Sequence, residues 1–297
     1  MKVATVIVTY NRLNNLIECI EYLLKQSIQS DIIIVNNGST DGTKEYLNTI
    51  HNITVLNQEN LGGAGGFYSG TKYAYEHGYE WVWMMDDDGL PDKDQLKQLL
   101  FTASRHGFKI LNALVIDKED HSRLAFGKHE PIDTINIQNE YIKQPLSPFN
   151  GTFIHRSVID KVGFIKKEMF IWGDEQEYMA RIRQGGFTPY TVTKAIHYHP
   201  REKGQKDWAL PFIKKGQVMI KPPKMSHYYY RNLGYINWRY SGKIVTIKNI
   251  IYYTIFFLRK LNIEELIKFY KYFIYGIKNK YLSSTYKCNF LGADNKQ

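Results

Sequence analysis

The chain has 297 residues, of which 43% are hydrophobic, 14% aromatic and 23% charged. This composition provides enough apolar side chains for one large domain or two smaller ones, and it excludes disordered, collagen-like and small disulfide-stapled proteins. Only two cysteines occur, Cys19 and Cys288, so we expect neither a disulfide framework nor a cysteine zinc site. The low cysteine content predicts a cytoplasmic location. The first residues do not show a charged region, a long apolar region and a small-residue cleavage site in succession, so we do not expect a signal peptide.

Charge is distributed unevenly along the chain. Residues 1–200 contain 20 Lys and Arg against 24 Asp and Glu, a net charge of −4, whereas residues 201–297 contain 19 against 5, or +14. The basic segment is also rich in aromatic residues, a combination that suits an anionic membrane surface or a nucleic acid. The change in charge predicts two parts, residues 1–200 and a mainly helical region 201–297.

In the first half, β-branched runs alternate with amphipathic stretches, which is the pattern of an α/β fold with a mostly parallel sheet and crossover helices. We predict strands at residues 3–9, 32–35, 53–56, 81–85 and 191–197. Helices are predicted at residues 13–26, 43–50, 68–77 and 93–102, and another helix begins after Trp172. The helix at 68–77 would be entered through a glycine-rich loop at 61–66.

Three aspartates, Asp86, Asp87 and Asp88, follow the apolar run 81–85 directly. Because side chains alternate along extended backbone, Asp86 and Asp88 are expected on one side and Asp87 on the other. A pair of carboxylates suits Mg²⁺ or Mn²⁺, which bridges protein carboxylates and substrate phosphates. The alternative is a solvated acidic turn before a helix, but a buried strand that ends in a carboxylate cluster favours a functional site.

The motifs together resemble the inverting family 2 glycosyltransferases of the GT-A fold. The resemblance is carried by the ordered segments 6–12, 31–43, 60–63 and 86–88, and it continues through 150–152, 172–177 with Arg181, and a histidine near 197–199. It covers roughly residues 3–200. The segment 60–67 looks most like galactofuranosyltransferases, and the aromatic stretch 228–232 looks like a segment of rhamnosyl- and galactofuranosyltransferases.

The resemblance implies a role for each matching position. Donor binding is expected where polar residues and glycines follow the strands, since α/β sheets place nucleotides there and glycine permits close backbone approach: Thr9, Tyr10, Asn11, Arg12, Asn36, Asn37, Asn60, Gly62, Gly63 and Asp87. Asn36 stands where the family usually has Asp. The metal is expected at Asp86 and Asp88, with His199 slightly favoured over His197 as a further ligand.

The resemblance implies a catalytic base at the start of the helix after Trp172. Counting back from Arg181 places it at Glu175, with Asp174 as the rival, and inverting transfer needs such a carboxylate to take the proton of the acceptor hydroxyl. An acidic helix N-terminus favoured by the dipole is the alternative. Trp172 and Gly151 are expected near the acceptor or donor sugar, although Trp172 could equally be a core residue.

The expected function is metal-dependent transfer of galactofuranose from UDP-galactofuranose to a hydroxyl of a cell-surface glycan, with a lipid-linked acceptor. Rhamnosyl transfer from dTDP-rhamnose is the alternative, and a non-catalytic nucleotide-sugar-binding protein is the alternative of another class. No nucleic-acid partner is expected, because no recognition motif accompanies the basic segment.

The basic segment is expected to bind an anionic membrane surface. Its longest uncharged run, residues 249–258, is too short to span a bilayer, which takes about 20 apolar residues. A helix that lies on the inner face of the plasma membrane would instead use the apolar side chains within residues 248–280, among them Ile250, Ile251, Tyr253, Phe256, Phe257, Leu261, Leu266, Phe269 and Phe273. The alternative is that the aromatic residues complete the core of the catalytic domain and that the lysines form a solvated face.

Overall fold

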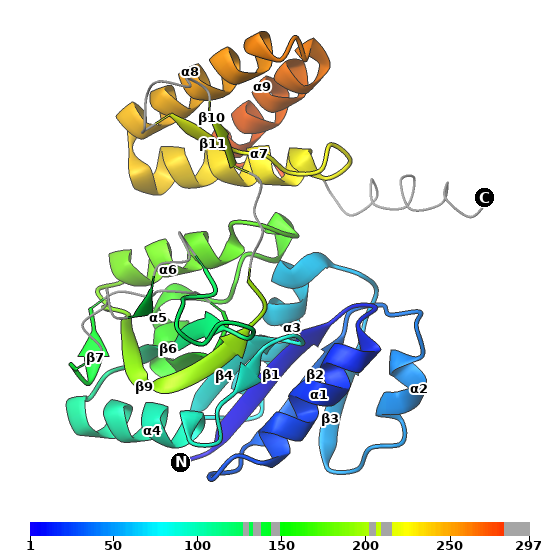
Figure 1. The fold of residues 1–297 in the computed structure, drawn as a ribbon, viewed down its shortest axis with the longest axis vertical. Coiled ribbons are helices and arrows are strands. Elements are labelled where there is room, and N and C mark those ends of the chain that lie inside the picture. Colours follow the sequence, from blue (N-terminus) through cyan, green and yellow to red (C-terminus); the bar gives the residue numbers. More distant parts are fainter. Residues whose placement is uncertain (127–130, 133–137, 144–148, 202–205, 209–215, 282–297) are drawn as a thin grey trace. The chain divides into compact units, whose positions relative to one another are not determined.

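The computed structural model describes residues 1–126, 131–132, 138–143, 149–201, 206–208 and 216–281. The chain divides into two compact units, Met1–Lys203 and Gly204–Gln297 (Figure 1). The charge pattern had placed a boundary near residue 200. No helix among the described residues is both long and apolar enough to cross a membrane.

The first unit is built on one large sheet. In the described residues this sheet has nine strands in the order β3-β2-β1-β4-β8-β6-β9-β5, with β7 paired to β9. Six strands share one direction, and β8, β5 and β7 run opposite to them. The strands are β1 (Val3–Thr9), β2 (Asp31–Asn36), β3 (Ile53–Asn57), β4 (Trp81–Asp86), β5 (Leu90–Pro91), β6 (Ile110–Asp117), β7 (Tyr141–Ile142), β8 (Thr152–His155) and β9 (Tyr190–His199).

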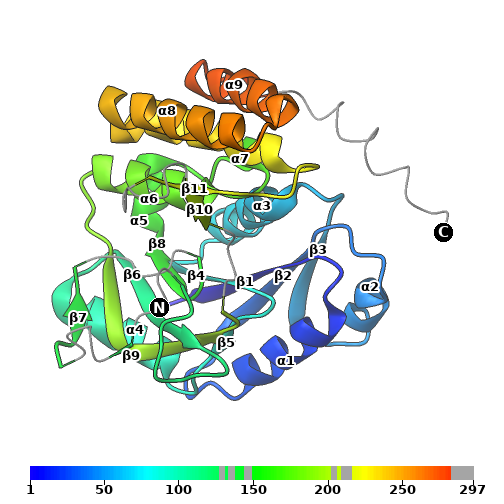
Figure 2. The ribbon, with the colours of Figure 1, turned by 45° about the horizontal axis from the view of Figure 1, so that its top comes forward.

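Helices cover both faces of this sheet. On one face α1 (Leu13–Leu24) and α4 (Gln95–His106) bury leucines against β1 and β4, and on the other α3 (Gly62–Glu76) packs on β1 and β2 (Figures 1 and 2). The unit also contains α2 (Thr43–Leu47), α5 (Arg156–Val162), a 3₁₀ turn (Lys167–Met169) and α6 (Asp174–Gln184). The mostly parallel α/β architecture predicted from the sequence is confirmed.

The glycine-rich segment was expected to be a loop, and this is wrong. Helix α3 begins at Gly62, six residues earlier than predicted, and of its first glycines only Gly62 has positive φ, at 72°. Gly66 and Gly70 instead allow close helix–strand packing, because a Cβ on either would overlap Val8 or Val6 of β1. The glycines at four-residue spacing therefore allow α3 to lie close to the sheet, whereas the sequence alone suggested a loop.

The second unit has its own core. It contains β10 (Lys206–Trp208) paired with β11 (Gln217–Met219), α7 (Ser226–Ile236), a π-helical turn (Asn237–Ser241), α8 (Lys243–Arg259) and α9 (Ile263–Ile277). One buried cluster joins β11, α7, α8 and α9, and it consists of Val218, Tyr230, Tyr253, Phe256, Phe257, Phe269 and Phe273. Most of the aromatic residues expected on a membrane therefore lie inside this unit, which corrects that expectation.

Gly66→Ala is expected to lower the free energy of unfolding by about 1–3 kcal/mol, because the added methyl group has to displace Val8 in a buried strand. Gly63→Ala is the matched control in the same helix. Its Cβ would meet no atom within 4 Å, so stability should stay constant or rise slightly. Urea denaturation measures both variants, and equal destabilisation would contradict the packing role of Gly66.

Candidate active site

Three potential metal ligands converge at one edge of the sheet. Single ligand atoms of Asp86, Asp88 and His199 all lie within 4.8 Å of one another, and the three residues are partly buried or buried. Asp86 ends β4, and His199 ends β9. The two are joined through β5, where Leu90 pairs with Tyr198 and so carries the turn containing Asp88 up to the end of β9. Backbone pairing thus assembles residues that are more than 100 positions apart in the sequence.

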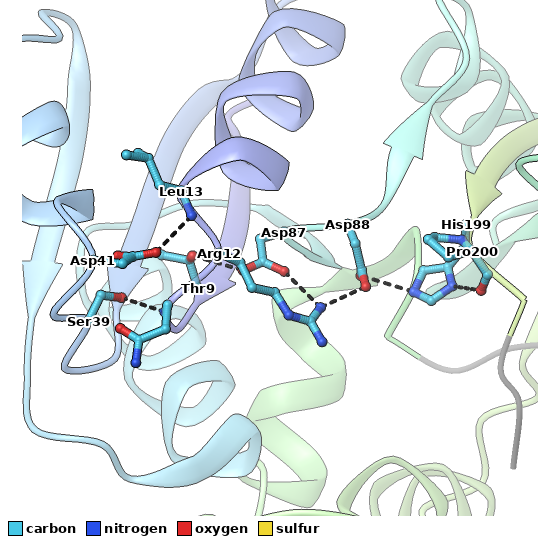
Figure 3. A network of polar contacts seen from close by, with 10 residues as sticks. Thr9, Arg12, Leu13, Ser39, Asp41, Asp87, Asp88, His199 and Pro200 are labelled. Carbon is cyan, nitrogen blue, oxygen red and sulfur yellow. Dashed lines mark hydrogen bonds and ion pairs between the residues drawn. The ribbon is translucent and has the colours of Figure 1, made fainter. Parts of the chain in front are cut away.

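The second hydrogen bond of His199 fixes which ring nitrogen faces the carboxylates. Nδ1 lies 2.7 Å from the carbonyl oxygen of Pro200, which only accepts, so Nδ1 carries a proton (Figure 3). Nε2 lies 3.1 Å from Asp88 Oδ1. In the neutral ring Nε2 therefore holds the lone pair and points it at the carboxylate pair, which is the arrangement of a ligating histidine held by an outer carbonyl.

Asp87, which is not in the metal-ligand group, is held by residues of the first motif. Its Oδ2 accepts a hydrogen bond of 2.8 Å from Thr9 Oγ1, and its Oδ1 lies 3.3 Å from Arg12 Nη1. The same Arg12 nitrogen donates to Asp88 Oδ2 at 2.7 Å. Arg12 thus bridges two neighbouring carboxylates, and its side chain remains 52% exposed (Figure 3).

The surroundings of the three aspartates give them different pKa values. Burial, with the negative charge of Asp88, raises the pKa of Asp86 to about 7. Burial also raises the pKa of Asp87 to about 6, against the opposing effect of Arg12. Burial acts on Asp88 in the same direction, but His199 and Arg12 outweigh it and lower its pKa to about 2. In return, Asp88 raises the pKa of His199 despite burial of the ring. The group therefore has an excess of negative charge that a cation would stabilise.

His197 lies apart from this ligand group. Its ring is completely buried, its Nδ1 lies 3.1 Å from Gln95 Oε1, and burial lowers its pKa to about 3. A Cβ on Gly89 would overlap its Nε2, so that nitrogen faces the turn backbone. Gly151 packs beside the same ring, between Gln95 and Ala113, with positive φ of 74°. The structure thus places Gly151 in packing around His197 rather than on an open surface.

The predicted asparagines shape the turns at the ends of β2 and β3. Asn36, 3% exposed, donates to Asn57 Oδ1 and accepts from the Ser39 amide. Asn37, 2% exposed, donates to the Gly62 carbonyl at 3.0 Å and accepts from the Leu61 amide at 3.1 Å. Both side chains are therefore engaged within the protein.

Asn60 completes the entrance to α3. Its Oδ1 accepts from the Gly62 amide at 2.9 Å and lies 3.3 Å from Asn37 Nδ2. The Ala64 amide donates to the Phe170 carbonyl at 3.1 Å, and a Cβ at Gly62 would overlap that same residue. The family motif at 60–63 therefore fixes the start of the helix against the segment that leads into α6, a role that motif matching alone did not reveal.

Several predicted donor-binding residues remain open to solvent. Tyr10 is 41% exposed, and Gly63 has free space beside its Cα. Asn11 has positive φ of 53°, and its Oδ1 accepts from the Thr40 amide at 2.7 Å. This strained turn is supported by Asp41, a residue that the sequence reading did not select, which accepts from the amide of Leu13 at the start of α1 (Figure 3). Asp41 could have been noticed as a side chain that caps a helix from outside it.

Helix α6 begins with the two candidate bases. Trp172 and Gly173 both have positive φ, at 60° and 105°, so the chain turns sharply before Asp174. Asp174 is only 4% exposed, and burial raises its pKa to about 7, with Asp86 and Glu177 adding to the effect. Glu175 is partly exposed, and its charge also acts on Asp86. Both carboxylates therefore lie in the electrostatic surroundings of the metal-ligand group.

Arg181 links α6 to the end of α5 and the residues that follow it. Its guanidinium makes hydrogen bonds of 2.9 and 2.8 Å to the two oxygens of Glu177, which is 1% exposed, and it donates to the carbonyls of Val162 and Phe164. A bidentate pair of this kind compensates the buried carboxylate. The spacing from Arg181 thus has a structural reason, since this residue sets the position of the first turn of α6.

The donor set fits a hard divalent cation. Two carboxylates and one imidazole nitrogen within 4.8 Å, with a deficit of positive charge, suit Mg²⁺ or Mn²⁺ with positions left for phosphate oxygens and water. The carboxyl ends of β1 and β4 meet here through their direct pairing, and that edge of an α/β sheet is where nucleotides bind.

Comparison with known proteins identifies the family. Residues 5–163 match the model of glycosyl transferase family 2, and the chain belongs to this family. The galactofuranosyltransferase GlfT1 of Mycobacterium tuberculosis is 30% identical over 79% of this chain and 81% of its own length. The dTDP-rhamnosyl transferase RfbF of Shigella flexneri is 25% identical over 65% of this chain and 67% of its own length.

Solved structures share the fold. TarS 1–349 of S. aureus in complex with UDP-GlcNAc matches with a TM-score of 0.59 and 13% identity, over 93% of this chain and 82% of that one. The mannosyltransferase PcManGT of Pyrobaculum calidifontis, in complex with GDP-Man and Mn²⁺, matches with a TM-score of 0.54 and 15% identity, over 91% and 73%. The chain therefore has the GT-A fold, and its membership of family 2 makes it a glycosyltransferase.

Proposed function

We propose that this enzyme is a metal-dependent, inverting galactofuranosyltransferase that uses UDP-galactofuranose. The observation that carries the proposal is the convergence of Asp86, Asp88 and His199 beside the nucleotide-binding edge of the sheet. The choice of sugar is supported by the 30% identity to a galactofuranosyltransferase over most of both chains. Rhamnosyl transfer from dTDP-rhamnose is the second candidate, favoured by the weaker similarity to RfbF.

Asp86, Asp88 and His199 would hold Mn²⁺ or Mg²⁺. The ion would offset the negative charge that develops on the diphosphate as UDP departs. Arg12 lies on Asp88 and Asp87 and is half exposed, so it is placed to restrain the aspartates and to add positive charge on the solvent side. His197 stays neutral in the core because of its low pKa and supports the turn before β5.

The donor would lie along the exposed part of the sheet edge. Tyr10, Asn11 and Arg12 offer a polar border for the nucleotide, and Gly63 leaves space at the start of α3, where the helix dipole favours an anionic group. Thr9, Asn36, Asn37, Asn60 and Gly62 act beneath this border by holding its turns in place. Trp172, half-buried before α6, would contact a sugar ring.

Glu175 would act as the base. Its carboxylate takes the proton of the acceptor hydroxyl while that oxygen attacks the anomeric carbon, the bond to the UDP oxygen breaks, and configuration inverts. A base has to reach its substrate, and Glu175 is partly exposed whereas Asp174 is buried. Asp174, with a pKa of about 7, would instead position the helix start below the reacting atoms.

The acceptor would be a hydroxyl of a growing, lipid-linked surface glycan at the inner face of the plasma membrane. This assignment is supported by the strongly basic second unit, because a lipid-linked acceptor requires the enzyme to work at an anionic surface. A protein that only binds nucleotide sugars would be expected to lack a metal carboxylate or the base, and this chain has candidate residues for both.

A donor panel tests the proposal. UDP-galactofuranose should give the fastest nucleotide release with Mn²⁺, dTDP-rhamnose should be poor, and excess EDTA should abolish release. Asp88→Asn should remove activity and Mn²⁺-dependent UDP binding, because it deletes a charged ligand. Asp94→Asn, an exposed aspartate at the start of α4, is the matched control and should behave as the wild type. Full turnover in EDTA would contradict metal dependence, and preference for dTDP-rhamnose would replace the donor assignment.

Glu175→Gln should reduce kcat by several orders of magnitude and leave donor affinity nearly unchanged, because the lost carboxylate acts on the acceptor. Asp174→Asn is the paired variant and should retain most of kcat. Steady-state kinetics with both substrates varied separates the two effects. An inactive Asp174→Asn enzyme beside an active Glu175→Gln enzyme would exchange the two roles.

A further inference from the structure

Among the described residues, the second unit exposes more large apolar side chains than the first unit does. On α8, Ile244 is 75% exposed and Ile247 55%, and in the turn that follows Leu261 is 85% exposed. On α9, Ile267 is 64% exposed. Together with their exposed neighbours they form what we name the outer stripe, which consists of Ile244, Ile247, Ile251, Leu258, Leu261, Ile263, Ile267 and Ile274.

The spacing shows that the stripe is a continuous face of each helix. Its α8 members recur at intervals of three, four and seven residues, and its α9 members at intervals of four and seven, so each set lies along one side. The opposite sides carry the buried residues, such as Tyr253 and Phe257 on α8 and Phe269 and Phe273 on α9. Because both helices bury these residues in one shared core, both parts of the stripe face away from the same interior.

Positive charge surrounds the stripe. Helix α8 contains no acidic residue, and Lys243 and Lys248 lie exposed on it. Lys271 is exposed on α9, and Lys278 is exposed directly after its last residue. Of the two glutamates of α9, Glu264 is exposed in the first turn, whereas Glu265 is buried and accepts hydrogen bonds from Tyr230 and Lys268. The exposed charges on the two helices beside the stripe are therefore mostly positive.

We infer that the outer stripe docks on an anionic lipid surface. Isoleucine and leucine side chains would enter the boundary between headgroups and acyl chains, and the lysines beside them would meet anionic headgroups at about 1 kcal/mol each. A second copy of the chain fits this face less well, because each copy brings a region of net charge +14 and no matching acidic surface on α8.

The outer stripe keeps Ile251 and Leu261 of the residues expected from the sequence and excludes the aromatic ones. Tyr253, Phe256, Phe257, Phe269 and Phe273 are core residues, and the lipid-facing side chains are mainly isoleucines on the other side of the same helices. The inference extends the proposed function, since it places the enzyme where a lipid-linked acceptor would be. Its test uses no donor, so a failure of lipid binding and a failure of the transfer reaction are distinguishable.

Vesicle co-sedimentation of the full chain tests the inference. The wild type should bind vesicles that contain phosphatidylglycerol, bind pure phosphatidylcholine weakly, and lose affinity at high salt. Changing Ile247, Ile251 and Ile267 together to Ser should weaken binding by at least about tenfold, because large apolar groups no longer leave water. Changing Lys248, Lys271 and Lys278 together to Gln should weaken binding to anionic vesicles and remove its salt dependence.

The matched control is Leu24→Ser with Phe101→Ser, which removes apolar side chains that are 59% and 55% exposed on the first unit. This variant should bind vesicles as the wild type does, and thermal melts should show that all variants remain folded. Absence of wild-type binding to anionic vesicles, or undiminished binding by the triple Ser variant, would overturn the inference. It would also be overturned if light scattering showed a dimer that the triple Ser change converts to monomer while vesicle binding is unaffected.

Discussion

Three consecutive aspartates at the end of a buried strand repel one another, and the arrangement of the first unit is adapted to this constraint. Asp87 is turned aside to Thr9 and Arg12, and Asp88 is paired with Arg12 and His199. Burial and the charge of Asp88 raise the pKa of Asp86 to about 7, because the opposing effect of His199 is too small to offset them. The site therefore keeps unbalanced negative charge in a partly buried position, which is the condition under which a divalent cation binds strongly.

The surrounding fold supports this group from several directions. The pairing of β5 with β9 brings Asp88 to His199, and the Pro200 carbonyl sets the imidazole so that Nε2 faces the carboxylates. The segment before α6 lies against Gly62 at the start of α3, and the bidentate pair of Glu177 and Arg181 holds the first turn of α6. The residues that we propose as donor border, metal ligands and base are thus connected through backbone contacts and ion pairs.

The sequence was sufficient to predict the elements with strong local patterns. β1 matches its predicted bounds, and the acidic triplet lies where the apolar run predicted a buried strand end. The sequence was insufficient where contacts between distant residues determine the local structure or the role of a side chain. The glycines of α3 resemble a loop until Val6 and Val8 are placed beside them. The structural roles of Asn36 and Asn37 in holding turns follow only from their partners Asn57 and Gly62, which the sequence does not place beside them. Likewise α8 is apolar on two sides, and only packing shows which side is core.

The central claim is that Asp86, Asp88 and His199 together hold the catalytic ion. Electron–nuclear double resonance of Mn²⁺ bound with UDP tests it most directly, because a ligating imidazole couples its nitrogen to the metal electrons. The account predicts a nitrogen coupling that disappears in His199→Gln and persists in His197→Gln, whose ring is buried beside Gln95. A spectrum without nitrogen coupling, or a coupling that His197→Gln removes and His199→Gln leaves intact, would contradict it.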